Sequence, residues 1–237
     1  MAERVESLFV DDDSTMGAFV ATPSGAGPHP AMVVIAGAVG VDSAVTEITR
    51  RLAAAGYSAV APDMFHRLDP REWDGETTRA PKLTDTWIIA DVNAAIAHIQ
   101  SQATVQADRI GIMGFCMGGR VSLVMASVNP TLKASVAFYP GNSLAPRPDG
   151  PSAIARLKDA YCPILGFFGA EDQNPSPEHM QQLDEELTKL GKPHKFHSMP
   201  GAAHNFMGFN NPQTYRVSAA TTAWPLALTF LQEHLGG

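Results

Sequence analysis

Short runs of apolar residues alternate along this chain with segments of helical spacing, and this alternation limits the folds open to it. Most of the runs, such as AMVVIA from Ala31 and ILGFFG from Ile164, are continuously apolar and do not alternate with polar residues. Continuous apolar strands are typical of parallel sheets, because helices cover both of their faces. The sequence therefore predicts an α/β fold with a mostly parallel central sheet flanked by helices on both faces.

The same pattern gives the bounds of the predicted elements. Strands are expected at 4–9, 17–21, 31–36, 58–64, 109–115, 134–140, 164–169 and 194–199. Helices are expected at 43–55, 84–102, 117–127, 177–190 and 217–235. No helix separates the first two strands, so we expect them to form an antiparallel lead-in to the sheet.

Nothing in the sequence divides the chain into parts. It has no internal repeat, no low-complexity tract and no long Pro/Gly/Ser linker among its 237 residues. A single domain of this size buries about 70–75% of the surface of its unfolded chain. We therefore expect one domain over 1–237, present as a monomer or a homodimer.

Composition excludes several classes of protein. Two cysteines are too few for a secreted disulfide framework, and their spacing does not match a zinc site, which favours a reducing compartment and no metal or other cofactor. The acidic N-terminal residues do not resemble a signal peptide, and no run of about 18 apolar residues follows, so we expect a cytoplasmic protein away from membranes. A net charge of −7 argues against nucleic-acid partners.

Two segments fit neither a helix nor a strand. They are residues 66–83, HRLDPREWDGETTRAPKL, and residues 140–153, PGNSLAPRPDGPSA. Loops of this length are uncommon inside a compact domain and often serve as lids or binding loops. Both segments are therefore candidates for a part of the functional site.

The stretch GFCMGG, residues 114–119, places a cysteine between glycines where a strand meets a helix. This pattern is typical of a nucleophile elbow, a tight turn that holds its central residue, here Cys116, above the sheet. The N-terminus of the following helix favours the thiolate over the thiol. The backbone N–H of Met117 can donate to an oxyanion that forms at the reacting carbonyl.

A nucleophile at such an elbow needs a base and an acid that orients the base. Asp172, in GAEDQNP, and His204, in PGAAHNF, each follow a predicted strand, in the chain order nucleophile, acid, histidine. The carboxyl ends of the strands are the edge at which α/β sheets gather their ligand sites. Glu171 is the alternative acid; we favour Asp172 because one more residue beyond the strand lets the loop turn its carboxylate toward His204.

Structural roles are the alternatives to these chemical ones. A cysteine at a tight turn is often only a small apolar core residue, and we expect that role for Cys162, which precedes Pro163 at a strand start. Asp63 follows a strand and can face the cleft, but stabilisation of the turn is expected. The remaining histidines are expected to be solvated or structural: His29, His66, His98, His179, His194, His197 and His234.

These motifs together resemble the dienelactone hydrolase family of α/β hydrolases. The resemblance extends over nearly the whole chain, through VVIAGAVGV, AAAGYSAVAPDMF, IGIMGFCMGGR, GAEDQNP and PGAAHNF. It implies an α/β-hydrolase fold, with Cys116 as the nucleophile, His204 as the base and Asp172 as its orienting acid.

The resemblance also implies an oxyanion hole. The Met117 amide would supply one donor, and an amide just after strand 31–36 the other, that of Ala38 with Val39 as the next choice. Arg120 follows the elbow, where we expect it to brace the helix.

Two positions differ from the pattern of the members that act on dienelactone. Those members have a glutamate in the turn that reads AGAVGV here, and an arginine soon after the histidine where this chain has HNFMGF. Phe206 and Met207 cannot hold a carboxylate as a guanidinium does. Arg79 or Lys82 is an alternative anion anchor, although a solvated loop charge is expected for both. The differences predict a substrate other than dienelactone itself.

The sequence thus predicts a carboxylic ester or lactone hydrolase that works through a Cys-His-Asp triad and a thioester acyl-enzyme. Apolar neighbours of the triad, namely Phe115, Met117, Phe206 and Met207, indicate a pocket for a hydrophobic acyl or ring group, or belong to the core. A hydrolase-fold protein that binds a ligand with little turnover is the alternative function. A thiol redox role remains a third hypothesis, which requires Cys162 to react with Cys116.

Overall fold

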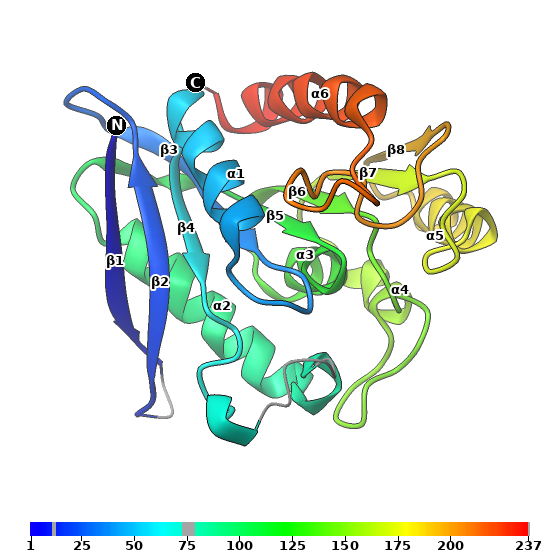
Figure 1. Ribbon diagram of the computed structural model, residues 1–237, viewed down its shortest axis with the longest axis horizontal. Helices are drawn as coiled ribbons and strands as arrows, with labels where there is room; N and C mark the ends of the chain where they lie inside the picture. Colours follow the sequence, from blue (N-terminus) through cyan, green and yellow to red (C-terminus); the bar gives the residue numbers. More distant parts are fainter. Residues whose placement is uncertain (11–12, 73–78, 237) are drawn as a thin grey trace.

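Eight strands form one sheet in the residues that the computed structural model describes, which are 1–10, 13–72 and 79–236 (Figure 1). The strands are β1 (Ala2–Phe9), β2 (Thr15–Thr22), β3 (His29–Ile35), β4 (Ser58–Pro62), β5 (Val105–Phe115), β6 (Leu132–Phe138), β7 (Ile164–Gly169) and β8 (His194–Met199). Their order across the sheet is β1-β2-β4-β3-β5-β6-β7-β8.

The sheet is antiparallel at one end and parallel over the rest. β1 pairs antiparallel with β2, and β2 pairs antiparallel with β4. The pairs from β4 through β3, β5, β6 and β7 to β8 are all parallel. The predicted fold class and the antiparallel lead-in are confirmed.

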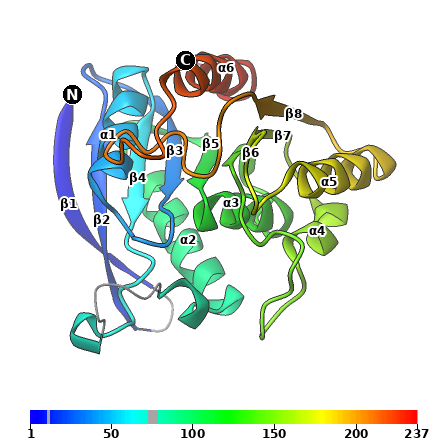
Figure 2. The ribbon, with the colours of Figure 1, turned by 45° about the vertical axis from the view of Figure 1, so that its right-hand side comes forward.

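Helices cover both faces of the sheet. α1 (Ser43–Ala54) and α6 (Val217–Leu235) lie on one face, and α2 (Asp85–Gln100), α3 (Met117–Val128) and α5 (Pro177–Lys189) lie on the other (Figures 1 and 2). The alternation of side chains along a strand divides β3 between the two cores. Met32 and Val34 pack with residues of α1 and α6, whereas Val33 and Ile35 pack with residues of α2 and α3. This double burial explains why the central strands read as continuous apolar runs.

Polar side chains cap the N-termini of α1 and α2. Asp42 precedes α1 and accepts a hydrogen bond from the Val45 amide at 3.0 Å. Thr84 precedes α2 and accepts one from the Trp87 amide at 3.2 Å. Such caps satisfy amides that have no partner inside the helix. They therefore define where each helix starts, close to the predicted positions.

Some bounds differ from those that the sequence predicts. β5 begins at Val105 and not at 109, because its first residues pair with β3 across an irregularity: His29 faces Val105, and Ala31 already faces Ile110. Residues 107–109 of β5 are exposed, so this part of the strand lacks the buried apolar run from which the rest of β5 is predicted. The short helix α4 (Ala153–Arg156) and the single 3-10 turns at Pro70–Glu72, Ala80–Lys82 and Leu157–Asp159 are too short to predict from periodicity. Among the described residues, none of the helices combines the length and the apolar character needed to span a bilayer.

A buried ion pair ties the elbow helix to its neighbours. Arg120, in the first turn of α3, donates from Nη1 to Asp85 Oδ1 at 2.8 Å and from Nη2 to Asp85 Oδ2 at 3.1 Å. Both side chains are almost fully buried. Arg156 donates to the same carboxylate at 3.2 Å, and Asp149 accepts from the Asp85 amide. Arg120 thus braces α3 against α2, and Asp85 links this pair to the segment 140–153.

Candidate active site

Cys116 occupies a strained turn between β5 and α3. Its backbone has φ 56° and ψ −117°, a region that costs a residue with a side chain about 1–3 kcal/mol. Its amide donates to Phe138 O at 3.0 Å, which fixes the turn against β6. The side chain is only partly buried. The thiol is therefore held at the carboxyl end of the central strands, as the elbow motif predicts.

The glycines of the motif make this turn sterically possible. A Cβ on Gly114 would lie 1.9 Å from Gly118 O, and one on Gly118 would lie 2.2 Å from Ile35 O. A Cβ on Gly119 would lie 2.6 Å from Phe138 O. Each contact is with backbone that cannot move without displacing α3 or a strand. The glycines therefore let α3 approach β3 and β6 closely.

His204 and Asp172 come together beside Cys116 from two different loops. His204 lies after β8, and its Nδ1 is 2.8 Å from Oδ2 of Asp172, which lies after β7. Asp172 is buried, and its Oδ1 accepts from the Asn174 amide at 2.9 Å. Glu171 is exposed. Between the two acids considered, the structure pairs Asp172 with the histidine.

The pKa values of the thiol and the imidazole move in opposite directions. Burial acts to raise the pKa of Cys116, but hydrogen bonding and the positive charge of His204 outweigh it, together with the Met117 and Ala38 amides, and the pKa falls below its usual 9.0. Burial acts to lower the pKa of His204, yet its bonds to Asp172 and Cys116 raise it to about 10. Together the shifts favour a thiolate–imidazolium pair over a neutral thiol and imidazole.

The two amides named as oxyanion donors both face the sulfur. Hydrogen bonds from the Met117 and Ala38 backbone N–H groups contribute to the lowered pKa of Cys116. The oxyanion forms on the oxygen of the carbon that the sulfur attacks, two bonds from the sulfur, so amides close to the sulfur are placed near the developing charge. The structure therefore brings all five predicted site residues to one place.

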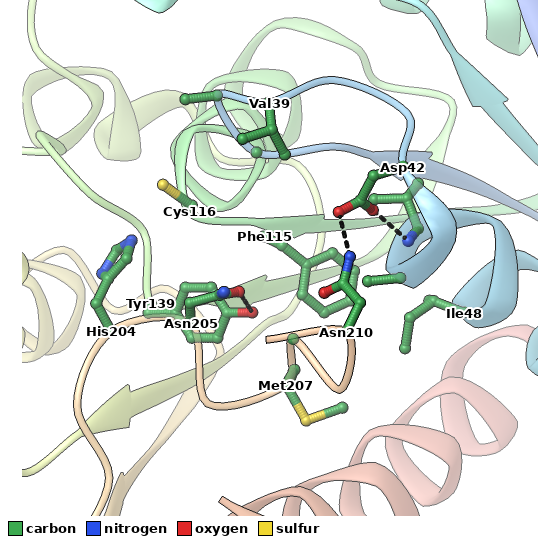
Figure 3. Close-up of a pocket in the computed structure, with 15 residues that line it drawn as sticks. Val39, Asp42, Ile48, Phe115, Cys116, Tyr139, His204, Asn205, Met207 and Asn210 are labelled. Carbon is green, nitrogen blue, oxygen red and sulfur yellow. Dashed lines mark hydrogen bonds between the residues drawn. The ribbon is translucent and has the colours of Figure 1, made fainter. Parts of the chain in front are cut away.

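A cavity opens on each side of the Cys116–His204 pair. The first, which we name the Ile48 cavity, has a volume of about 220 Å³ and is lined by Val39, Asp42, Val45, Ile48, Phe115, Tyr139, Asn205, Met207 and Asn210, among others (Figure 3). The second, the Arg147 cavity, has a volume of about 330 Å³ and is lined by Ala80, Pro81, Met117, Gly141, Asn142, Ala145, Pro146, Arg147 and Asn174. Cys116, His204 and Ala38 line both cavities.

Both long loops that the sequence indicates contribute residues to the wall of the Arg147 cavity. The segment 140–153 supplies much of the wall of the Arg147 cavity. Of the segment 66–83, residues 73–78 lie outside the described residues, so its role as a lid stays a prediction. Ala80 and Pro81 line the Arg147 cavity, whereas the Arg79 guanidinium lies over the Phe65 ring at 4.7 Å. Lys82 is exposed.

The apolar neighbours of the triad divide between cavity and core. Phe115 and Met207 line the Ile48 cavity, and Met117 lines the Arg147 cavity. Phe206 is fully buried and stacks edge-on against Tyr139. Cys162 is also in the core, where burial raises the pKa of its thiol to about 12. Asp63 accepts from the Phe65 amide at 3.0 Å, which stabilises the turn as expected.

Most of the other histidines have partners away from the site. His66 pairs with Asp91, and His194 pairs with Asp184. His179 belongs to the cap of α5. His98 contacts Glu6, His197 stacks on Phe167 and His234 packs against Phe230. In the part of the chain that the structure describes, no group of three His, Cys, Asp or Glu side chains is arranged to hold a metal ion.

Several polar residues of the cavities were not predicted from the sequence. Asp42 and Asn210 lie at the Ile48 cavity, and Tyr139 lies between that cavity and the His204 ring, with ring centroids 5.0 Å apart. Arg147 lies at the Arg147 cavity. A signal existed for Arg147 alone, because it is the single basic residue in the loop 140–153. The others approach Cys116 only through the folding of separate loops.

Known proteins resemble this chain over most of its length. A protein of Methylorubrum extorquens with the name "Putative carboxymethylenebutenolidase" is 32% identical over 224 residues, which cover 90% of this chain and 75% of that protein. A Bradyrhizobium protein with the name "Probable 2-oxo-3-(5-oxofuran-2-ylidene)propanoate lactonase" is 29% identical over 229 residues, 93% of this chain and 90% of that protein.

A solved structure agrees with the fold. The crystal structure of a "Putative Dienelactone Hydrolase" from Klebsiella pneumoniae has a TM-score of 0.89 at 26% identity, and the match covers 98% of this chain and 100% of that one. The sequence model of the dienelactone hydrolase family matches residues 16–235. Since the match runs through every element from β2 to α6, this chain belongs to the dienelactone hydrolase family of the α/β-hydrolase superfamily.

Proposed function

We propose that this protein hydrolyses lactones or small activated esters through a Cys116–His204–Asp172 triad. One observation carries the proposal. The partly exposed thiol of Cys116, in a strained turn, faces the imidazole of His204, which is hydrogen-bonded to the buried carboxylate of Asp172. The relatives named as carboxymethylenebutenolidase and lactonase support the same class of reaction.

The first half of the reaction forms a thioester. The Cys116 thiolate attacks the carbonyl carbon, and the oxygen of that carbonyl becomes an oxyanion held by the Met117 and Ala38 amides. When the tetrahedral intermediate collapses, the C–O bond to the leaving group breaks. Imidazolium His204 gives its Nε2 proton to the departing oxygen. Asp172 keeps the ring oriented through Nδ1.

The second half releases the acid. Neutral His204 takes a proton from a water molecule while the water oxygen attacks the thioester carbonyl. Collapse of this intermediate breaks the C–S bond, and the thiolate–imidazolium pair is restored. Because the lowered pKa of Cys116 favours the thiolate, substrates whose leaving oxygen departs as a stabilised enolate or phenolate suit this site best.

Turnover of p-nitrophenyl acetate tests the proposal. Alkylation of the protein with iodoacetamide and the Cys116→Ala substitution are each expected to reduce turnover to the uncatalysed level. A Cys162→Ala variant is the matched control and is expected to keep full activity, because its thiol lies in the core. Wild-type protein that binds lactones tightly but forms no product would instead favour the binding function.

A further inference from the structure

The Ile48 cavity has mostly apolar walls, and its volume limits the size of the group that it can hold. Val45 and Ile48 of α1, Phe115 of β5 and Met207 after β8 all line it. Figure 3 shows Ile48, Phe115 and Met207 on the side away from the Cys116 sulfur. A dry cavity of about 150 Å³ holds a benzene ring. The volume of about 220 Å³ here is therefore enough for a phenyl ring or a chain of about six carbons.

The side-chain amides and the tyrosine hydroxyl of this cavity each have an acceptor within the protein. The Asn210 side-chain amide donates to Asp42 Oδ2 at 2.7 Å, and that of Asn205 donates to Thr214 Oγ1 at 3.2 Å. The Tyr139 hydroxyl lies 3.4 Å from Asn205 Oδ1, to which it donates. A ligand carboxylate would need free donors to replace its water shell. The walls therefore do not form an anion site.

Asp42 adds a negative charge to the wall. Its carboxylate is held by the Val45 amide at 3.0 Å and by Asn210, so it cannot turn out of the cavity freely (Figure 3). Of the 15 residues that line the cavity, His204 alone can carry a positive charge, and its ring is already paired with Cys116 and Asp172. Burial first, and then the charges of Cys116 and Asp42, raise the pKa of Tyr139, so the Asp42 charge acts across the cavity.

The two cavities suit different parts of a substrate. When an ester reacts, the acyl group stays on the sulfur while the alcohol leaves and water enters, so one cavity can hold the acyl group and the other the leaving group. Asn142, Arg147 and Asn174 give the Arg147 cavity a polar wall. Because Arg147 donates to the Ala80 and Leu83 carbonyls and Asn174 donates to Asn142, the two linings differ mainly in the sign of the charged residue that they carry, which is Asp42 in the Ile48 cavity and Arg147 in the other.

Building on the hydrolase function proposed above, we propose that the Ile48 cavity binds the acyl group and selects an uncharged, apolar one of up to about six carbons. Asp42 is the residue that discriminates against acyl groups ending in a carboxylate. The substrate class is thus a neutral aryl or medium-chain acyl ester or lactone, in which any polar group lies on the alcohol side.

Three p-nitrophenyl esters with the same leaving group test this proposal. They are the acetate, the hexanoate and the monoester of hexanedioic acid, which matches the hexanoate in length but ends in a carboxylate. We expect kcat/KM for the hexanoate to exceed that for the acetate by about tenfold or more, since each well-buried methylene adds to binding. We expect the hexanedioate monoester to fall at least about tenfold below the hexanoate.

Asp42→Asn removes the charge and keeps the cap of α1, because asparagine caps a helix as well as aspartate does. It is expected to raise the ratio of kcat/KM for the hexanedioate monoester to that for the hexanoate by about tenfold. Ile48→Phe fills the cavity and is expected to lower the hexanoate-to-acetate ratio by about tenfold. Glu47→Gln removes a charge from the same helix at a residue that does not line the cavity, and both ratios should stay as in the wild type.

The outcomes separate the two proposals. The hydrolase function would be overturned if the wild-type protein did not hydrolyse p-nitrophenyl acetate, or if the Cys116→Ala variant still did. Cys116-dependent turnover with equal rates for the hexanoate and its anionic analogue, unchanged by Asp42→Asn, would overturn the acyl selectivity and leave the hydrolase standing.

Discussion

The Nδ1 atom of His204 lies 2.8 Å from Oδ2 of Asp172, and the other side of the ring faces Cys116 (Figure 3). The buried carboxylate favours the protonated ring, and the protonated ring favours the thiolate. The three side chains therefore titrate as a unit, and the pH dependence of activity reports on their arrangement.

Activity toward an activated ester should depend on pH through this unit. The thiolate is lost on the acid side, below the usual thiol pKa of 9.0, because the pKa of Cys116 is lowered. The imidazolium is lost on the alkaline side, near pH 10, because the pKa of His204 is raised to about 10. We therefore expect a bell-shaped profile of kcat/KM whose alkaline limb lies far above the titration of an ordinary histidine.

Asp172→Asn tests the cause of that alkaline limb. Removal of the carboxylate that raises the pKa of His204 is expected to move the limb down by about one to two pH units. Glu171→Gln is the matched control, since it neutralises an exposed carboxylate next in sequence, and it should leave the limb in place. A limb that moves with Glu171→Gln and not with Asp172→Asn would reverse the assignment of the acid.

The two cysteines should differ sharply toward iodoacetamide. Cys116 is partly exposed with a lowered pKa, whereas Cys162 is buried and its pKa is raised to about 12. Because the thiolate is the reacting form, Cys116 alone should be modified at pH 7 in the folded protein. Mass spectrometry of the digested protein, with and without denaturant, measures the modification at each site. Equal modification of both thiols under native conditions would contradict this.

The close approach of α3 to β3 makes Gly118 sensitive to substitution. An alanine Cβ there would lie 2.2 Å from Ile35 O, so β3 or α3 must shift. Gly118→Ala is expected to lower the free energy of unfolding by about 3 kcal/mol or more, measured by urea denaturation. Gly17→Ala is the control, because a Cβ at Gly17 meets nothing within 4 Å, and it should change stability by less than about 1 kcal/mol. Similar losses for both variants would contradict the packing described.

Local signals explain how far the sequence could predict this structure. The continuous apolar runs revealed the central strands, since double burial leaves its mark on each residue of a strand, as in Val33 and Val34. The elbow around Cys116 was equally visible, because its glycines are required by contacts within one short turn and its neighbouring strands. The apolar runs and the elbow could both be predicted because each depends on residues that lie close together in the sequence.

The features that escaped prediction depend on how distant loops meet. Asp42 and Asn210 are 168 residues apart, and neither carries a motif that announces the other. The partner of Arg120 was also unpredictable, although its bracing role was expected, since Asp85 lies 35 residues away on another helix. Such pairs form only after the sheet is assembled, so the walls of the two cavities could not be derived from the sequence.

A covalent acyl group on Cys116 is the most direct evidence for the proposed reaction. Wild-type protein and a His204→Gln variant would be mixed with p-nitrophenyl hexanoate, quenched with acid and analysed by intact-mass and peptide mass spectrometry. We predict one hexanoyl group on the peptide that contains Cys116, lasting longer in His204→Gln because deacylation needs the imidazole base. Full turnover with no adduct on that peptide at any time, together with activity retained in Cys116→Ala, would contradict the thioester mechanism.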